Sequence, residues 1–153
     1  EVKHVGKGAV LFARHLFART AQPTAGDDER KAWQEQARVH LSKAIALAPG
    51  APEAYLLLAW SHTWGYADVR KGLAAAAKAD ALVPYHPEVY VVMGMLYKRA
   101  GQLESARTYL SAVERLRHAG GWAKQARALL DELTESADAP EPAKTSGSNS
   151  QPL

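Results

Sequence analysis

Apolar residues recur every three or four positions along most of the chain, and the strict alternation typical of β-strands is not seen in it. Near the N-terminus, Val5, Ala9, Phe12 and Leu16 follow this spacing. Residues three or four positions apart lie on the same face of an α-helix. The pattern therefore predicts an all-α fold, in which each helix buries one face.

Proline, glycine and acidic residues divide this pattern into separate helices. Pro52 and Pro87 suit the first turn of a helix, where an N–H group has no partner within the helix. Asp68 suits the capping position before a helix. Residues 137–153 contain too little apolar surface to offset the entropy of ordering, so we predict that they are disordered. The predicted helices span residues 2–20, 27–48, 52–65, 69–82, 87–101, 103–117 and 120–136.

Two sequence markers repeat with one spacing. The tetrapeptide Pro52–Tyr55 has a counterpart in Pro87–Tyr90, 35 residues later, and Pro49 has one in Pro84, also 35 residues later. Helix pairs that recur at a fixed period are typical of stacked repeat proteins. The tetratricopeptide period is about 34 residues, so we expect one inserted residue, in the turn formed by residues 64–68.

The segment 87–116 resembles one tetratricopeptide (TPR) repeat, with aromatic, large and small residues at the positions of that motif. His118 stands where the motif has proline, and the N-terminal repeat fits more loosely than the others. The motif positions that we assign to the last two repeats are Tyr55, Leu58, Ala59, His62, Gly72, Ala76, Pro84, Tyr90, Met93, Gly94, Tyr97, Ala106 and Leu110.

This resemblance implies a right-handed α-solenoid of antiparallel helix pairs. The predicted helical-repeat domain covers residues 1–136, with repeats at 3–49, 52–84 and 87–118 and a capping helix at 120–136. The small motif residues, such as Gly94, are expected where two helices cross most closely. A Gly94→Leu substitution should therefore overpack the crossing and cost on the order of 1–3 kcal/mol.

In TPR proteins, peptide ligands usually lie in a concave groove lined by the first helix of each pair. Transferring these positions implies an apolar floor beside a basic wall. Two other interpretations stay open: the tryptophans could pack between repeats against Phe17 and Val91, and the cations could be a solvated helix end. The candidate groove residues are Arg14, Phe17, Leu56, Trp60, Trp64, Val91, Met95, Lys98 and Arg99, with Lys7, Val10, Glu53, Thr63 and Glu88 at neighbouring groove positions.

Composition narrows the classes of function. The chain has no cysteine, which excludes disulfides and thiolate metal sites and fits either a cytoplasm or a periplasm. The compartment stays open, with the cytoplasm favoured. The net charge of +3 comes from scattered residues, so we predict no nucleic-acid partner. No apolar run approaches the roughly 18 residues of a membrane span, so we predict no membrane insertion.

Candidate chemistry is also sparse. The six histidines lack the helical spacing to a carboxylate that a metal site needs, and no nucleophile is paired with a base. His62 takes an aromatic motif position, and we interpret it as a hydrogen-bonded core residue. We therefore predict no catalytic residue, no metal and no cofactor.

The predicted function is a non-catalytic protein–protein interaction module, a scaffold or adaptor that binds a segment of another protein. The alternative is a regulatory or substrate-docking domain of a larger enzyme whose catalytic part is not in this chain. Because the chain begins at Glu1 rather than Met, we expect it to be an excised domain or a processed fragment. Self-association through the exposed terminal helices, such as Val2–Phe17, stays open.

Overall fold

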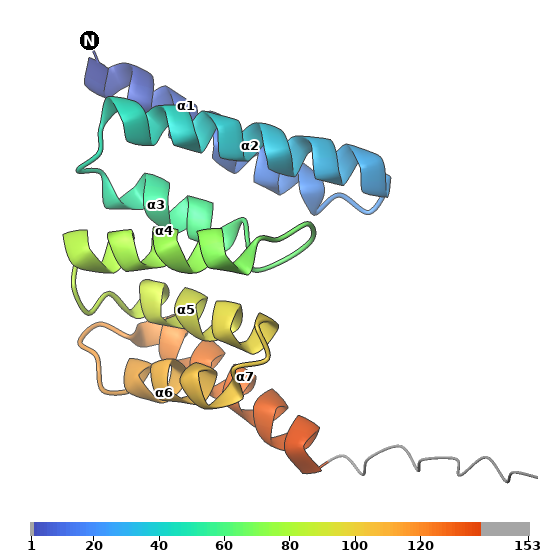
Figure 1. Ribbon diagram of the computed structural model, residues 1–153, viewed down its shortest axis with the longest axis vertical. Coiled ribbons are helices and arrows are strands. Elements are labelled where there is room, and N and C mark those ends of the chain that lie inside the picture. The colour runs from blue at the N-terminus through green and yellow to red at the C-terminus, as the bar shows by residue number, and fades with distance from the viewer. Residues whose placement is uncertain (1, 139–153) are drawn as a thin grey trace, which may run out of the picture.

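The computed structural model describes residues 2–138, and the regular secondary structure in this range is helical throughout (Figure 1). The prediction of an all-α fold with seven helices is confirmed for this part of the chain. The helices are α1 (Val2–Thr20), α2 (Asp27–Leu47), α3 (Pro52–Trp60), α4 (Val69–Leu82), α5 (Pro87–Arg99), α6 (Leu103–Val113) and α7 (Gly120–Asp138).

Four predicted helix ends were wrong by two residues or more, and one of them is the end of α5, at Arg99 instead of Gly101. Helix α3 ends at Trp60 instead of near Gly65, and α7 continues through Asp138, two residues past its predicted end. Helix α6 ends at Val113, after which Arg115 and Leu116 donate to carbonyls only three residues back, at 3.1 Å each. This tighter pattern is typical of a fraying helix end. The rest of the predicted disordered tail, residues 139–153, lies outside the described residues.

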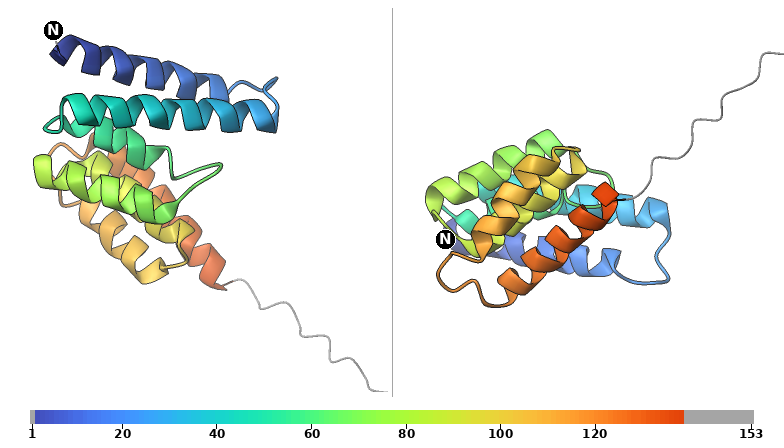
Figure 2. Two further views of the ribbon diagram at one scale, coloured as in Figure 1. Left: turned by 45° about the horizontal axis from the view of Figure 1, so that its top comes forward. Right: turned by 90° about the horizontal axis from the view of Figure 1, so that it is seen from below.

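The helices are stacked along the long axis of the molecule as consecutive antiparallel neighbours (Figure 1). The pairs α1–α2, α3–α4 and α5–α6 make the most extensive contacts, and each pair then contacts the next helix in sequence. The backbones of α1, α3, α5 and α7 also contact one another in that order, whereas among the described residues those of α2, α4 and α6 do not. The odd-numbered helices therefore share one side of the stack, and Figure 2 shows it from two further directions.

The core consists of three apolar clusters that are joined through the middle helices. One lies between α1, α2 and α3, one between α3, α4 and α5, and one between α5, α6 and α7. Helix α5 contributes to the last two, with Val92 and Leu96 facing one cluster and Val91 the other. Burial on both sides makes α5 the central helix of the C-terminal half.

Small residues lie where helices cross most closely. A Cβ atom on Gly94 would meet Leu110 Cγ at 2.5 Å, and one on Gly72 would meet Leu96 Cδ2 at 2.7 Å. Carbon atoms in good contact are about 3.5–4.0 Å apart. Only glycine therefore fits these two crossings without movement of the neighbouring side chain.

The other predicted motif residues lie around the same crossings. Ala59 and Ala106 have no exposed surface, and Tyr55 packs, partly buried, against the middle cluster. The rings of Tyr90 and Tyr97 both contact Tyr109, with centroids 5.5 and 5.3 Å away. Pro84 is exposed in the α4–α5 loop.

Candidate binding site

Helix α3 is apolar around most of its circumference, yet it is only partly covered. Of its nine residues, Ala54 and Ala59 are buried, and the larger apolar side chains keep part of their surface exposed. A helix that is hydrophobic all round is normally buried. The half-exposed residues are Tyr55, Leu56, Leu57, Leu58 and Trp60.

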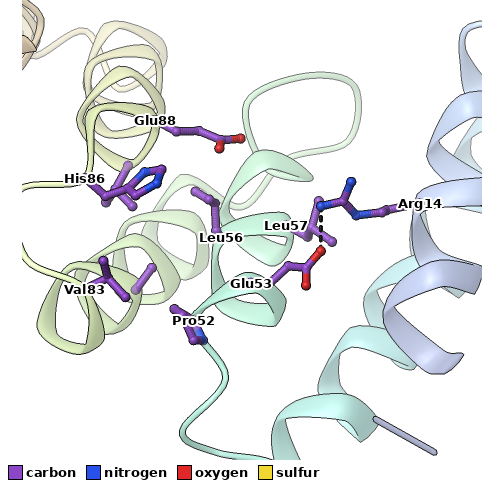
Figure 3. Close-up of a pocket in the computed structure, with 10 residues that line it drawn as sticks. Arg14, Pro52, Glu53, Leu56, Leu57, Val83, His86 and Glu88 are labelled. Atoms are coloured by element: carbon purple, nitrogen blue, oxygen red, sulfur yellow. Dashed lines mark hydrogen bonds and ion pairs between the residues drawn. The ribbon is translucent and has the colours of Figure 1, made fainter. Parts of the chain in front are cut away.

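A cavity of about 310 Å³, which we call the α3 pocket, opens beside this helix on the side of the odd-numbered helices. Leu56 and Leu57 of α3 form its centre (Figure 3). Helix α1 provides Arg14, while the α4–α5 loop and α5 provide the opposite wall. The other lining residues are Pro52, Glu53, Ala79, Val83, His86, Glu88 and Val89.

The charged groups of the α3 pocket are held by neighbouring side chains. Arg14 donates to Glu53 Oε1 at 2.5 Å, which links α1 to α3 (Figure 3). Trp60 Nε1 donates to Glu88 Oε1 at 2.9 Å, which links α3 to α5. The lining thus carries two carboxylates and one guanidinium, so its wall is slightly acidic instead of basic.

His86 adds an unsatisfied polar atom to this pocket. It is the residue before α5, and its imidazole is drawn toward Leu56 in Figure 3. Its Nδ1 atom is buried and has no hydrogen-bond partner among the described residues. Buried polar atoms in proteins are nearly always paired, so this nitrogen is an exception in the wall of the pocket.

The predicted groove is closed at its C-terminal end, which corrects one assignment. Val91 has no exposed surface, because it lies in the cluster between α5, α6 and α7. Met95 packs against the same cluster, and Lys98 forms an ion pair with Glu132 of α7. Helix α7 therefore covers the face of α5 that was expected to contact a partner, and Val91 is a core residue.

The two tryptophans pack against other side chains of the protein, which is one of the two interpretations left open by the sequence. Trp64 makes an edge-on contact with Phe17, with ring centroids 5.7 Å apart. Trp60 lies beside Trp122 of α7, with centroids 6.3 Å apart. Both remain partly exposed. Each ring therefore packs against another aromatic ring of the protein and leaves only part of its surface for a partner.

The cations of the predicted basic wall have partners inside the protein. Arg14 pairs with Glu53, and Lys98 pairs with Glu132. Arg99 donates to the carbonyl of Gly65 at 2.7 Å, and a second contact reaches the carbonyl of Thr63 at 3.3 Å. The three cations therefore link neighbouring helices to one another and α5 to the 61–68 turn.

That turn covers residues 61–68 and begins three residues before the turn predicted at residues 64–68. Gln34 of α2 is 1% exposed and donates to the carbonyls of Ser61 at 2.6 Å and Trp64 at 3.0 Å. Arg38 donates to Ser61 Oγ at 3.0 Å and to the carbonyl of Tyr66 at 2.5 Å. These bonds satisfy carbonyls that a continuing helix would have used, which explains why α3 ends early.

A second hollow, of about 620 Å³, lies on the other side of α3, between α2 and α4. It exists because those two helices do not touch there, and Tyr55 and Leu58 line its floor. His62 borders it but is only 3% exposed, and its Nδ1 accepts the Asp68 N–H at 3.0 Å. Burial and the nearby Arg38 charge lower the pKa of His62 to about 4. The interpretation of His62 as a hydrogen-bonded core residue is confirmed.

Asp68 caps α4, as predicted from the sequence. Its side chain accepts the Lys71 N–H at 3.2 Å, and this bond lowers the pKa of the carboxyl group. The cap also orients the Asp68 N–H toward His62. The loop between α3 and α4 therefore ends at a defined point.

Other chemistry in the described part of the chain is limited. No three His, Asp or Glu side chains within residues 6–135 are grouped so that they could hold a metal ion. None of the described helices combines the length and the apolar character needed to cross a bilayer. Comparisons with protein-family models, curated proteins and solved structures gave no match for this chain. Function must therefore be inferred from the geometry of the site.

Proposed function

We propose that this chain is a TPR-like, right-handed helical solenoid that acts as a non-catalytic protein-binding module. The period of 35 residues, the stacked hairpins and the glycines at the helix crossings support this assignment. In such an arrangement the odd-numbered helices line the inner side. The partner is a segment of another protein that lies on that side.

The partly exposed apolar face of α3 carries this proposal. Leu56 and Leu57 lie at the centre of a pocket whose volume falls within the range of small binding sites. A large apolar side chain of a partner would complete the burial that α3 lacks. Burying apolar surface contributes about 25 cal/mol per Å², so even one such side chain supplies useful affinity.

The walls of the α3 pocket set the preferred chemistry of that side chain. Glu53 and Glu88 flank Leu56, and only Arg14 offsets their charge. An apolar side chain with a cationic end, such as Lys or Arg, fits this combination because its stem can lie on the leucines. The pocket therefore selects an apolar or basic anchor.

The test compares capture of partner proteins by the full chain and by two leucine variants. Leu56→Gln places a polar amide in the α3 pocket, and Leu47→Gln makes the same change at an exposed position on α2. We expect proteins captured by the wild type to be lost with Leu56→Gln and kept with Leu47→Gln. Circular dichroism of both variants checks that they remain folded.

Two results would count against the proposal. One is equal capture of the same proteins by the folded Leu56→Gln variant. The other is a wild-type chain that retains nothing beyond the affinity tag alone. Trp60 and Arg99 are poor positions for this test because both hold the structure together.

A further inference from the structure

The α4–α5 and α6–α7 loops lie at the same edge of the stack (Figure 1), and a third cavity opens between them. We call it the loop cleft, and its volume is about 590 Å³. It combines cations with aromatic and apolar surface, and none of its lining residues is acidic. The lining residues are Val83, Pro84, Tyr85, His86, Pro87, Arg115, Leu116, Arg117, His118 and Trp122.

The two arginines of the loop cleft differ from the other cations described above, because they have no partner. The guanidinium groups of Arg115 and Arg117 make no hydrogen bond or ion pair with any described residue. The adjacent Glu114 cannot neutralise them, since it pairs with Arg127 at 2.5 Å. Two guanidinium groups without ion-pair partners can bind carboxylates or other oxyanions.

Both loops also contain an unusual backbone conformation. Tyr85 has a φ of 61° and His118 a φ of 60°, and these are the two non-glycine residues with positive φ in the described chain. Such conformations are concentrated at functional sites. Tyr85 is 70% exposed, and its N–H is held by Asp80 Oδ1 at 3.3 Å. Tyr85 therefore adds a largely exposed aromatic ring to the lining of the loop cleft.

The loop cleft adjoins the α3 pocket. Val83 and His86 line both, so an extended chain leaving one enters the other past the imidazole. Helices α5 and α7 both begin at the loop cleft, and the positive ends of their dipoles favour a negative charge there. One surface thus changes from slightly acidic to basic over the width of one loop.

We propose that the loop cleft binds Asp or Glu side chains of the same partner segment whose anchor enters the α3 pocket. This inference rests on the proposed function. Arg115 and Arg117 take the carboxylates, and Tyr85 and Trp122 contact the stems of these side chains. A nucleic acid fits less well, because a continuous polyanion would be repelled by Glu53 and Glu88 in the adjoining pocket.

The experiment selects binders to the full chain from a library of randomised linear peptides. Synthetic copies of the selected peptides are then titrated against the wild type and against Arg115→Gln combined with Arg117→Gln. Lys43→Gln combined with Arg70→Gln is the matched control, because it removes two exposed, unpaired cations outside both cavities. Peptides with every Asp and Glu changed to Asn and Gln complete the set.

We expect the selected peptides to be enriched in Asp and Glu. Loss of both arginines should weaken binding about tenfold, because two charge-assisted contacts disappear. The control should change affinity by about twofold or less, because lone exposed charges contribute little. Neutral peptides should bind the wild type and the double arginine variant equally.

Other outcomes separate this inference from the proposed function. If no peptide is selected beyond the tag alone, the proposed function fails and the inference falls with it. If selected peptides depend on Leu56 but not on the two arginines, binding in the α3 pocket stands and the loop cleft is not part of it. Arginine-dependent binding of a single-stranded oligonucleotide, with no acidic enrichment among peptides, would assign the cleft to nucleic acid and overturn the inference.

Discussion

A Gly94→Ala substitution tests how tightly α5 and α6 are packed. The added Cβ would lie 2.5 Å from Leu110 Cγ and 2.6 Å from its Cδ2. Leu110 has no exposed surface, so it cannot turn into solvent. Overpacking of this kind typically costs about 1–3 kcal/mol.

Helix propensity works in the opposite direction and must be separated from the clash. Alanine in a helix interior is more favourable than glycine by about 1 kcal/mol. Gly8 provides the matched control, because it lies inside α1 and a Cβ there meets nothing within 4 Å. We expect Gly8→Ala to stabilise the protein by up to about 1 kcal/mol and Gly94→Ala to fall about 1–3 kcal/mol below it.

The assay is thermal and urea unfolding followed by the helical circular dichroism signal. In a chain of 153 residues, 1 kcal/mol shifts the melting temperature by about 2–4 °C. A double-mutant cycle adds the decisive comparison. Leu110→Ala removes the clashing atoms, so Gly94→Ala should become stabilising in that background. The same effect for Gly94→Ala and Gly8→Ala, or a loss that persists without Leu110, would refute the close crossing.

Two further predictions concern the 61–68 turn. Gln34→Ala leaves the buried carbonyls of Ser61 and Trp64 without one of their donors, and chemical denaturation should show a loss of about 1–3 kcal/mol; an unchanged midpoint contradicts the role given to Gln34. The depressed pKa of His62, about 4, means that the unfolded chain binds more protons than the folded one below its ordinary pKa of 6.5. The contribution of His62 to the free energy of unfolding is therefore fully present above about pH 6.5. It decreases by about 3 kcal/mol as the pH falls toward 4. His62→Gln should remove this part of the pH dependence, and an identical stability profile for both proteins would exclude it.

Local features of the sequence predicted most of the helices, because their causes lie within a few residues. Pro52, Pro87 and Asp68 mark helix starts through the needs of unpaired N–H groups, and these starts were correct. Gly94 marked a close crossing because only a missing Cβ permits one. The end of α3 was not predictable in this way, since it depends on donors from another helix.

The candidate site was only partly predictable. Arg14 and Leu56 were placed at a groove and do line the α3 pocket, whereas His86 and Val83 were missed. Pro84 and Pro87 on either side of Tyr85 and His86 did mark this segment as a loop. Nothing local showed that the loop would border two cavities, because that depends on where the next hairpin lies.

The sequence by itself determined the number and type of helices, their order and the small residues between them. These follow from apolar periodicity and capping, which act over short distances along the chain. Only the tertiary structure decided which predicted groove residues are accessible. Helix α7 covers Val91, and Arg99 donates to carbonyls of the 61–68 turn. The guanidinium groups of Arg115 and Arg117 have no partner among the described residues. Accessibility and charge pairing depend on partners dozens of residues away, so repeat periodicity alone does not specify them.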